Sequence, residues 1–378
     1  MKHFRGLNDK EAQQLFHVPP YEFTKETDRK KLGIALGAAL YMPGLMPNFS
    51  SKLTKQYFQN LTSLFICLED AISDSELVEA EKNVIQELKL IEQAYAEGTM
   101  DKEQHPLLFL RIRSVQQFQE LATKLGSAIN LLTGIVFPKC TSHNAMDFLE
   151  CLDEFNRREY THLYALPILE TKEIIYTETR ELELVSLYEV FKKYEEIILT
   201  IRVGATDFSS LFSMRRPGNR TIYDLKIITD CLVDIINRFS RHSDDFVISG
   251  LVFEYFEQSA GPDAFLSTDS IEAVLWNEVQ LDVLNGLHGK TCIHPSQVDM
   301  VNAAYVVSKE MYDDAHLIIE KSAENNGVQK SRASNKMNEV KPHYNWAQKI
   351  LAQAEIYGVL KEHVPTNEFL RYIKSKNV

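Results

Sequence analysis

The sequence predicts a (β/α)8 TIM barrel with a C-terminal helical extension. Eight short apolar runs recur along the first 300 residues, and longer amphipathic segments separate them. The runs are almost continuously apolar, as parallel strands are when side chains cover both faces of a sheet. The segments between them repeat apolar residues every three and four positions, which indicates helices. Eight strand–helix units fit a closed barrel, and an open doubly wound sheet is the competing topology.

The predicted strands are short and rich in β-branched and aromatic residues. In chain order they span residues 34–42, 63–69, 107–112, 134–139, 163–170, 197–207, 245–253 and 290–295. No GxGxxG motif follows the first strand and no P-loop occurs, which weakens the nucleotide-binding alternative.

Two regions are expected along the chain. Residues 1–300 should form the barrel with an N-terminal extension, and residues 301–378 a C-terminal helical extension. A polar arm at about 322–343 interrupts the extension. The arm reads equally as a solvent-exposed connector or as a segment that reaches an active site, its own or a neighbour's.

Composition excludes several classes of protein. The formal charge is −12 and the pI is about 5.5, so no nucleic-acid partner is expected. The first residues, MKHFRGLNDKEAQQLF, carry scattered charges where a secretory signal needs an apolar core, and no stretch approaches the ~18 apolar residues of a membrane span. A cytoplasmic protein without a membrane partner is expected. The five cysteines are widely spaced, which fits reduced thiols.

Polar residues interrupt the apolar runs where the predicted strands end. Barrel enzymes carry their chemistry at the C-terminal ends of the strands, so these residues should converge on one cavity. In chain order they are Glu69 and Asp70, Arg111 and Arg113, Lys139, Glu170, Arg202 and Asp207, Glu254, and His294.

Glu170 and Asp207 end neighbouring predicted strands and are candidate ligands of one Mg²⁺ ion. Mg²⁺ needs one or two carboxylates besides water and substrate oxygens. Alternatively, each carboxylate simply pairs with an arginine such as Arg111 or Arg202. Arg111 together with the ion would stabilise negative charge on a substrate oxygen. His294 is a weaker candidate, because a His-Pro pair here could simply fix the turn.

Seven motifs stand in a fixed order: LYMPGLMPN (40–48), CLEDAI (67–72), LRIRS (110–114), FPK (137–139), PILET (167–171), GATDFSSLF (204–212) and CIHPSQV (292–298). Together they resemble the HpcH/HpaI aldolase and citrate lyase β-subunit family, in its branch of TIM-barrel carbon–carbon bond lyases. The resemblance implies Glu170 and Asp207 as Mg²⁺ ligands and Arg111 as the substrate-binding arginine. It implies Glu69 and Asp70 as an acidic pair near the metal site.

The resemblance extends to the arm. NKMNE (335–339) is similar to a segment that brings an acid over the active site of a neighbouring subunit in a trimer, which makes Glu339 a catalytic candidate and a homotrimer the expected assembly. Lys139, Arg113 and Thr206 are candidate substrate-binding residues. Arg113 adds a positive charge that relatives lack, and Cys67 replaces an aspartate.

The leading hypothesis is a metal-dependent carbon–carbon lyase acting on a 2-oxo or 3-hydroxy acid, or its acyl-CoA thioester, through an enolate. A second reading keeps the barrel and the metal but makes the reaction thioester hydrolysis or isomerisation. A third is a non-catalytic barrel that binds a metabolite or a partner protein in a biosynthetic or stress-response assembly.

Overall fold

One parallel sheet forms the centre of the molecule. The computed structural model describes residues 1–54, 60–101, 105–244, 246–257, 261–268, 270–323, 328–331 and 335–376. The strands of the main sheet are β2 (Ala38–Pro43), β3 (Ser63–Cys67), β4 (Leu107–Arg111), β5 (Leu132–Phe137), β6 (Tyr164–Leu169), β7 (Arg202–Val203) and β8 (Lys290–Cys292). They lie in the order β7–β6–β5–β4–β3–β2–β8, and every pair is parallel.

The sheet curls and is closed by the segment 246–253. Ile201 forms a parallel bridge with Ile248, and Gly250 forms one with Lys290 of β8. The segment thus fills the position between β7 and β8, and the (β/α)8 barrel predicted from the sequence is confirmed. The prediction of a full strand at 245–253 was wrong, because its neighbours are two and three residues long and offer only single pairing sites. Asp245 lies outside the described residues.

The first and the sixth predicted strands include residues that are helical in the structure. The first was to begin at Ile34, but Ile34 and Ala35 end a helix, and the chain turns at Gly37, with φ of +55°, before β2 starts. The sixth was to run to Asp207, but strand β7 consists of Arg202 and Val203 alone, and a helix starts at Ala205. Asp207 therefore lies in the first turn of that helix and not on a strand.

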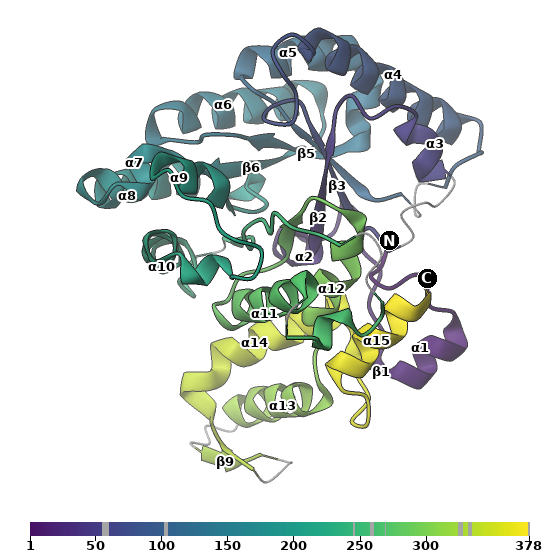
Figure 1. Cartoon of the computed structure of the whole chain (residues 1–378), viewed down its shortest axis with the longest axis vertical. Helices are drawn as coiled ribbons and strands as arrows, with labels where there is room; N and C mark the ends of the chain where they lie inside the picture. Colours follow the sequence, from purple (N-terminus) through teal and green to yellow (C-terminus); the bar gives the residue numbers. More distant parts are fainter. Residues whose placement is uncertain are drawn as a thin grey trace.

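Helices cover the outside of the barrel, and α4, α5 and α6 lie together over one side of the sheet (Figure 1). The helices of the barrel region are α1 (Asp9–Leu15), α2 (Arg29–Ala35), α3 (Phe49–Thr54), α4 (Leu77–Ala96), α5 (Val115–Leu125), α6 (Ser142–Glu159), α7 (Lys172–Ile175), α8 (Thr177–Lys193), α9 (Ala205–Leu211), α10 (Lys226–Phe239) and α11 (Ile271–Leu284). Among the helices described, none is long and apolar enough to cross a membrane.

Aromatic rings fill part of the barrel interior. Tyr41 of β2 stacks on Phe65 of β3, with ring centroids 4.9 Å apart, and Phe65 stacks on Phe109 of β4 at 4.5 Å. Phe65 and Phe109 are fully buried. The three rings stand on neighbouring strands in matching register, so they form a floor beneath the C-terminal ends of the strands.

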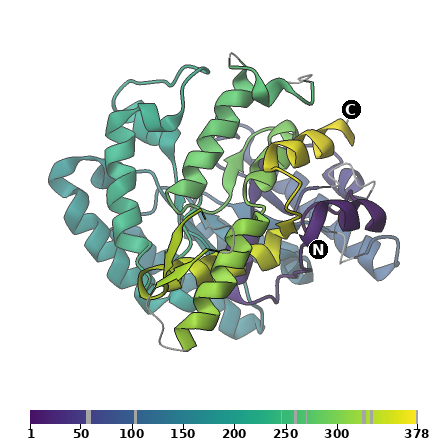
Figure 2. The same ribbon diagram turned by 90° about the horizontal axis from the view of Figure 1, so that it is seen from below.

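The C-terminal extension packs beside the barrel. Its helices are α12 (Val298–Ala304), α13 (Lys309–Ala323), α14 (Val340–Tyr357) and α15 (Thr366–Lys376), and its strands are β9 (Val328–Lys330), β10 (Met337–Glu339) and β11 (Val359–Leu360). β11 pairs with β1 (Phe16–Val18), and the Tyr372 hydroxyl donates a hydrogen bond to Glu11, so the two ends of the chain meet on one side of the molecule (Figures 1 and 2). The division at residue 300 stays a prediction.

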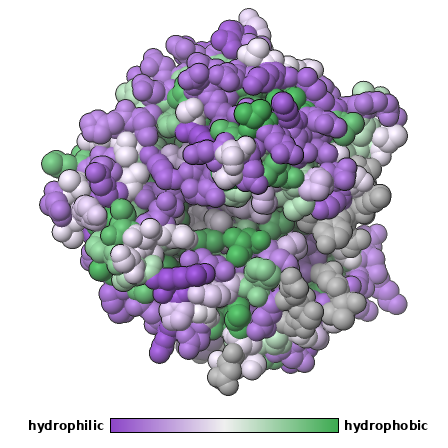
Figure 3. Space-filling view, turned by 45° about the horizontal axis from the view of Figure 1, so that its top comes forward, coloured by the Kyte–Doolittle hydropathy of each residue, from purple (hydrophilic) through white to green (hydrophobic). Residues whose placement is uncertain are grey.

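One face of the molecule is mainly hydrophilic. Hydrophilic side chains dominate the face in Figure 3, with apolar side chains gathered near its centre. The arm at 322–343 is described only in part: residues 324–327 and 332–334 lie outside the described residues.

Candidate active site

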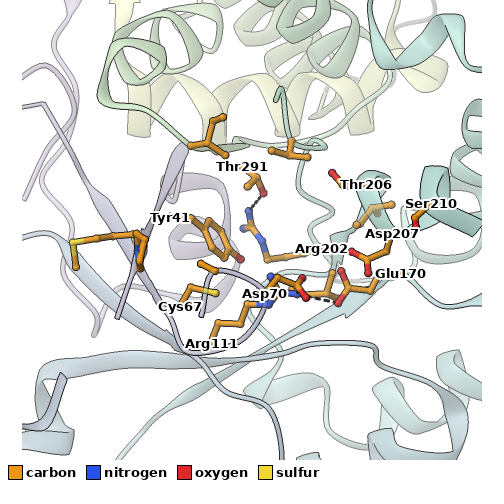
Figure 4. Close-up of a pocket in the computed structure, with 18 residues that line it drawn as sticks. Tyr41, Cys67, Asp70, Arg111, Glu170, Arg202, Thr206, Asp207, Ser210 and Thr291 are labelled. Atoms are coloured by element: carbon orange, nitrogen blue, oxygen red, sulfur yellow. Dashed lines mark hydrogen bonds and ion pairs between the residues drawn. The ribbon is translucent and has the colours of Figure 1, made fainter. Parts of the chain in front are cut away.

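A cavity of about 600 Å³ opens at the C-terminal end of the barrel strands. Its polar lining comes from β2, β3, β4, β6, β7, β8 and the loops and helix that follow them (Figure 4). The polar and sulfur-bearing residues are Tyr41, Cys67, Asp70, Arg111, Glu170, Arg202, Thr206, Asp207, Ser210 and Thr291. Most predicted strand-end residues therefore converge here, as barrel topology requires.

Arg111 lies at the centre of a group of carboxylates. Its Nη2 atom is 2.7 Å from Glu69, 2.9 Å from Asp70 and 3.2 Å from Glu170. Burial alone would lower the pKa of Arg111, but the neighbouring anions, Glu170 first, raise it above the ordinary value. Arg111 stays a cation, and its charge is shared among three acids.

Glu170 follows β6 directly and is buried, with 5% of its surface exposed. Its Oε1 accepts the backbone N–H of Lys139 at 2.8 Å. Burial raises the pKa of Glu170 to about 7; the Arg111 charge opposes the rise and the Asp207 charge adds to it. Burial and a neighbouring carboxylate both raise the pKa of a carboxyl group, and a nearby cation lowers it.

Gly204 makes room for that carboxyl. A Cβ built on Gly204 would lie 2.2 Å from Oε2 of Glu170 and 2.5 Å from its Cβ, closer than such atoms approach. Gly204 precedes α9, whose first turn carries Asp207. Glycine at this position therefore lets Glu170 and Asp207 stand next to each other (Figure 4).

Asp207 completes the acidic group. Burial and the Asp70 charge raise the pKa of Asp207, while Lys139 and Arg111 oppose the rise. The Asp207 carboxylate lies 3.9 Å from the ammonium group of Lys139.

Lys139 bridges the acids from the other side. Its ammonium group contacts Glu69 and lies 3.2 Å from Asp70. Lys139 has φ of +49°, in the left-handed region that non-glycine residues rarely adopt. This strained backbone aims the N–H of Lys139 at Glu170 while its side chain reaches back to Glu69.

The acidic pair after β3 is divided between two environments. The Glu69 side chain is 11% exposed, and burial raises its pKa against the effect of Arg111. The Asp70 side chain is 51% exposed and lines the cavity. Burial raises the pKa of Asp70, but hydrogen bonding with Glu69 and the Arg111 and Lys139 charges outweigh it, so the pKa lies below the ordinary value.

The charge balance of this group fits a divalent cation. The carboxylate cluster consists of Glu69, Asp70, Glu170 and Asp207. Among the described residues, only Arg111 and Lys139 pair with it, which leaves two negative charges when all four acids are ionised. In the described ranges no group of three or more His, Cys, Asp or Glu side chains is arranged to hold a metal. Two carboxylates with waters and substrate oxygens are a usual coordination for Mg²⁺, so Glu170 and Asp207 fit that ion.

The remaining predicted site residues lie in different places. Thr206 lines the cavity. Arg113 does not: it pairs with Asp74 and donates hydrogen bonds to the carbonyl groups of Leu68 and Ile72, so it holds the loop after β3. Glu339 ends β10, is exposed and does not line the cavity.

His294 also lies outside the cavity lining. Its Nδ1 accepts the backbone N–H of Ser296 at 3.2 Å, and its ring stacks on Phe256. His294 therefore caps the turn after β8.

Sequence reasoning missed Tyr41, Ser210 and Thr291, which line the cavity. Thr291 could have been identified from the alternation of side chains along a strand. Lys290 and Cys292 are buried away from the cavity, and Thr291 between them faces it. Arg216, in the loop after α9, is 1% exposed and pairs with Glu278 and Glu254.

Comparisons with known proteins point to one family. A family model described as C–C bond lyase of the TIM-barrel fold matches residues 30–359. CitE from Mycobacterium tuberculosis, in complex with magnesium, acetoacetate and coenzyme A, is 16% identical over 85% of this chain and 99% of its own, with a TM-score of 0.54. A citrate lyase from Burkholderia xenovorans LB400 is 14% identical over 89% of this chain and 96% of its own, with a TM-score of 0.61. A comparison with curated proteins gave no match.

Proposed function

This chain belongs to the family of C–C bond lyases of the TIM-barrel fold, the family that its ordered motifs predicted, and is a carbon–carbon lyase; we propose that its substrate is a 2-oxo or 3-hydroxy acid, or the acyl-CoA thioester of one, and that its cofactor is Mg²⁺. The observation that carries the proposal is the carboxylate cluster, in which four acids face the two cations Arg111 and Lys139 at the C-terminal end of the barrel. Glu170 and Asp207 would hold the ion.

The proposed reaction places negative charge on a substrate oxygen as the carbon–carbon bond breaks. A bound Mg²⁺ ion would polarise the substrate carbonyl and stabilise that charge. Arg111 fixes the Glu170 carboxylate by their 3.2 Å contact and presents a second positive charge at the wall of the cavity. Both effects lower the energy of an enolate more than that of the starting acid.

Lys139 and the acidic pair keep these groups in place. Glu69 binds both Arg111 and Lys139 from behind, so it orients the two cations. Asp70 lines the cavity with half of its side chain exposed, whereas Glu69 does not line it. Asp70 is therefore the residue of the pair that can contact a substrate, while Glu69 is a positioning residue.

A homotrimer in the cytoplasm belongs to the same proposal. Glu339 is exposed, and within one chain it does not line the cavity. An acid on this hairpin would act on the cavity of a neighbouring subunit. The relative CitE was solved with magnesium, acetoacetate and coenzyme A, and this combination of a metal ion, a small oxo acid and a CoA group supports the proposal.

The test compares Glu170→Gln with Glu181→Gln, an exposed acid on α8. Mg²⁺ binding is measured by titration calorimetry, and turnover by product analysis of 2-oxo acids, 3-hydroxy acids and their CoA thioesters. We expect Glu170→Gln to lose Mg²⁺ binding and carbon–carbon cleavage, and Glu181→Gln to keep both. Two carbon fragments indicate a lyase, whereas an intact acid and a free thiol indicate hydrolysis. Cleavage that persists in Glu170→Gln with chelator present would refute the proposal.

A further inference from the structure

Arg202 is a buried cation in the cavity, and no acid of the described segments neutralises it. It lies on β7, is 3% exposed and lines the cavity. In the part of the chain that the structure describes, no Asp or Glu forms an ion pair with it. Arg111 and Lys139 each contact three carboxylates, so Arg202 differs from every other cation of the cavity.

Two aromatic rings and one hydroxyl group hold the guanidinium of Arg202 in position and leave its other N–H groups free to bind a ligand. Its carbon Cζ lies 4.8 Å from the ring centre of Phe65 and 5.6 Å from that of Tyr41. One nitrogen donates a hydrogen bond to the hydroxyl of Thr291 on β8. Stacking on aromatic rings fixes the plane of the side chain without neutralising its charge.

A guanidinium has five N–H donors, and the protein satisfies one hydrogen bond here. The hydroxyl groups of Tyr41 and Thr291 also border the cavity beside it (Figure 4). A buried charge without a counter-ion is unfavourable, and an arriving carboxylate can pair with two parallel N–H groups of an arginine. The site is therefore built for an anion that the protein itself does not supply.

Resting on the proposed function, we infer that Arg202 binds a second carboxylate of the substrate, on the side of the cavity that Thr291 lines. The oxo or hydroxyl end of the acid faces Glu170 and Asp207, and the remote carboxylate lies against Arg202, Thr291 and Tyr41. The substrate class is then a short dicarboxylic oxo or hydroxy acid, or a thioester that keeps one free carboxylate. Arg202 is a specificity-determining residue.

The test uses two matched pairs of stable acids, each differing only in a terminal carboxylate: L-malate against 2-hydroxybutyrate, and 2-oxoglutarate against 2-oxopentanoate. Binding to the full-length protein is measured by calorimetry with Mg²⁺ present. We expect the wild-type protein to bind at least one dicarboxylate about tenfold or more tightly than its partner. Arg202→Met should reduce this preference to less than about twofold while the monocarboxylate still binds.

Arg202→Lys keeps the charge but not the planar pair of donors, so it should give an intermediate preference and serves if Arg202→Met does not fold. Arg157→Met, an exposed arginine on α6, should keep the wild-type preference. Equal binding of both members of each pair in the wild type, or a preference that survives in Arg202→Met, would overturn the inference and leave the proposed function standing. Failure of every acid to bind in the presence of Mg²⁺ would overturn the inference for free acids together with the free-acid form of the proposed function.

Discussion

Replacing Gly204 with alanine should disable the proposed metal site through a single methyl group. The new Cβ would stand 2.2 Å from Oε2 and 2.5 Å from Cβ of Glu170, and neither the side chain nor its neighbours leave room. Gly204 has φ of −95°, which alanine adopts without strain, so the clash is the whole effect. Glu170 must leave its contacts with Arg111 and the N–H of Lys139.

The expected magnitudes follow from this displacement. Adding a methyl group to a packed site costs about 1–3 kcal/mol of unfolding free energy. Disturbing the groups that orient a metal ligand commonly weakens metal affinity about 10- to 100-fold. Gly204→Ala should therefore show both a moderate loss of stability and a large loss of Mg²⁺ affinity.

The assay pairs urea denaturation with Mg²⁺ titration calorimetry on wild-type protein, Gly204→Ala and Gly261→Ala. A Cβ at Gly261 would meet no atom within 4 Å, so this control should resemble the wild type. If Gly204→Ala binds Mg²⁺ with wild-type affinity, either Glu170 does not hold the ion or the cavity wall yields easily, and the reasoning fails.

Two further predictions concern buried charges remote from catalysis. Burial lowers the pKa of His3 from 6.5 to about 3, so below about pH 6.5 the unfolded chain takes up a proton before the folded protein does. The free energy of unfolding therefore falls with decreasing pH, by about 2 kcal/mol at pH 5. His3→Gln should remove this part of the pH dependence measured by urea denaturation, and an unchanged pH dependence would contradict the assignment. Lys290 is fully buried, 2.8 Å from both Glu278 and Asp282, so Lys290→Met should cost about 3–5 kcal/mol by leaving buried acids unpaired. Lys124→Met, which removes a half-exposed cation 3.9 Å from its acids, should cost less than about 1 kcal/mol, and equal losses would argue against the effect of burial.

Several elements were predictable because they depend on local patterns. The strands β3, β4, β5 and β6 lie within two residues of their predicted bounds, since continuous apolar runs need cover on both faces. Elements at the barrel closure were not predictable in detail. The segment 246–253 is apolar like a strand, but whether it pairs depends on how much of β7 and β8 stands beside it.

The sequence by itself predicted the barrel class and, through its ordered motifs, the family. It also predicted that Glu170, Asp207, Arg111 and Lys139 lie close together, because parallel strands bring their ends to one edge whatever their exact lengths. Only the tertiary structure decided which of the arginines pair with carboxylates and which one faces the cavity without such a pair. Arg111, Arg113 and Arg202 look equivalent in a strand-end pattern, yet one is surrounded by acids, one turns to a loop and one faces the cavity without an acidic partner among the described residues. Whether an arginine forms an ion pair depends on the direction of its side chain and on its distance from carboxylates of neighbouring strands, and the spacing of residues along the chain does not specify either.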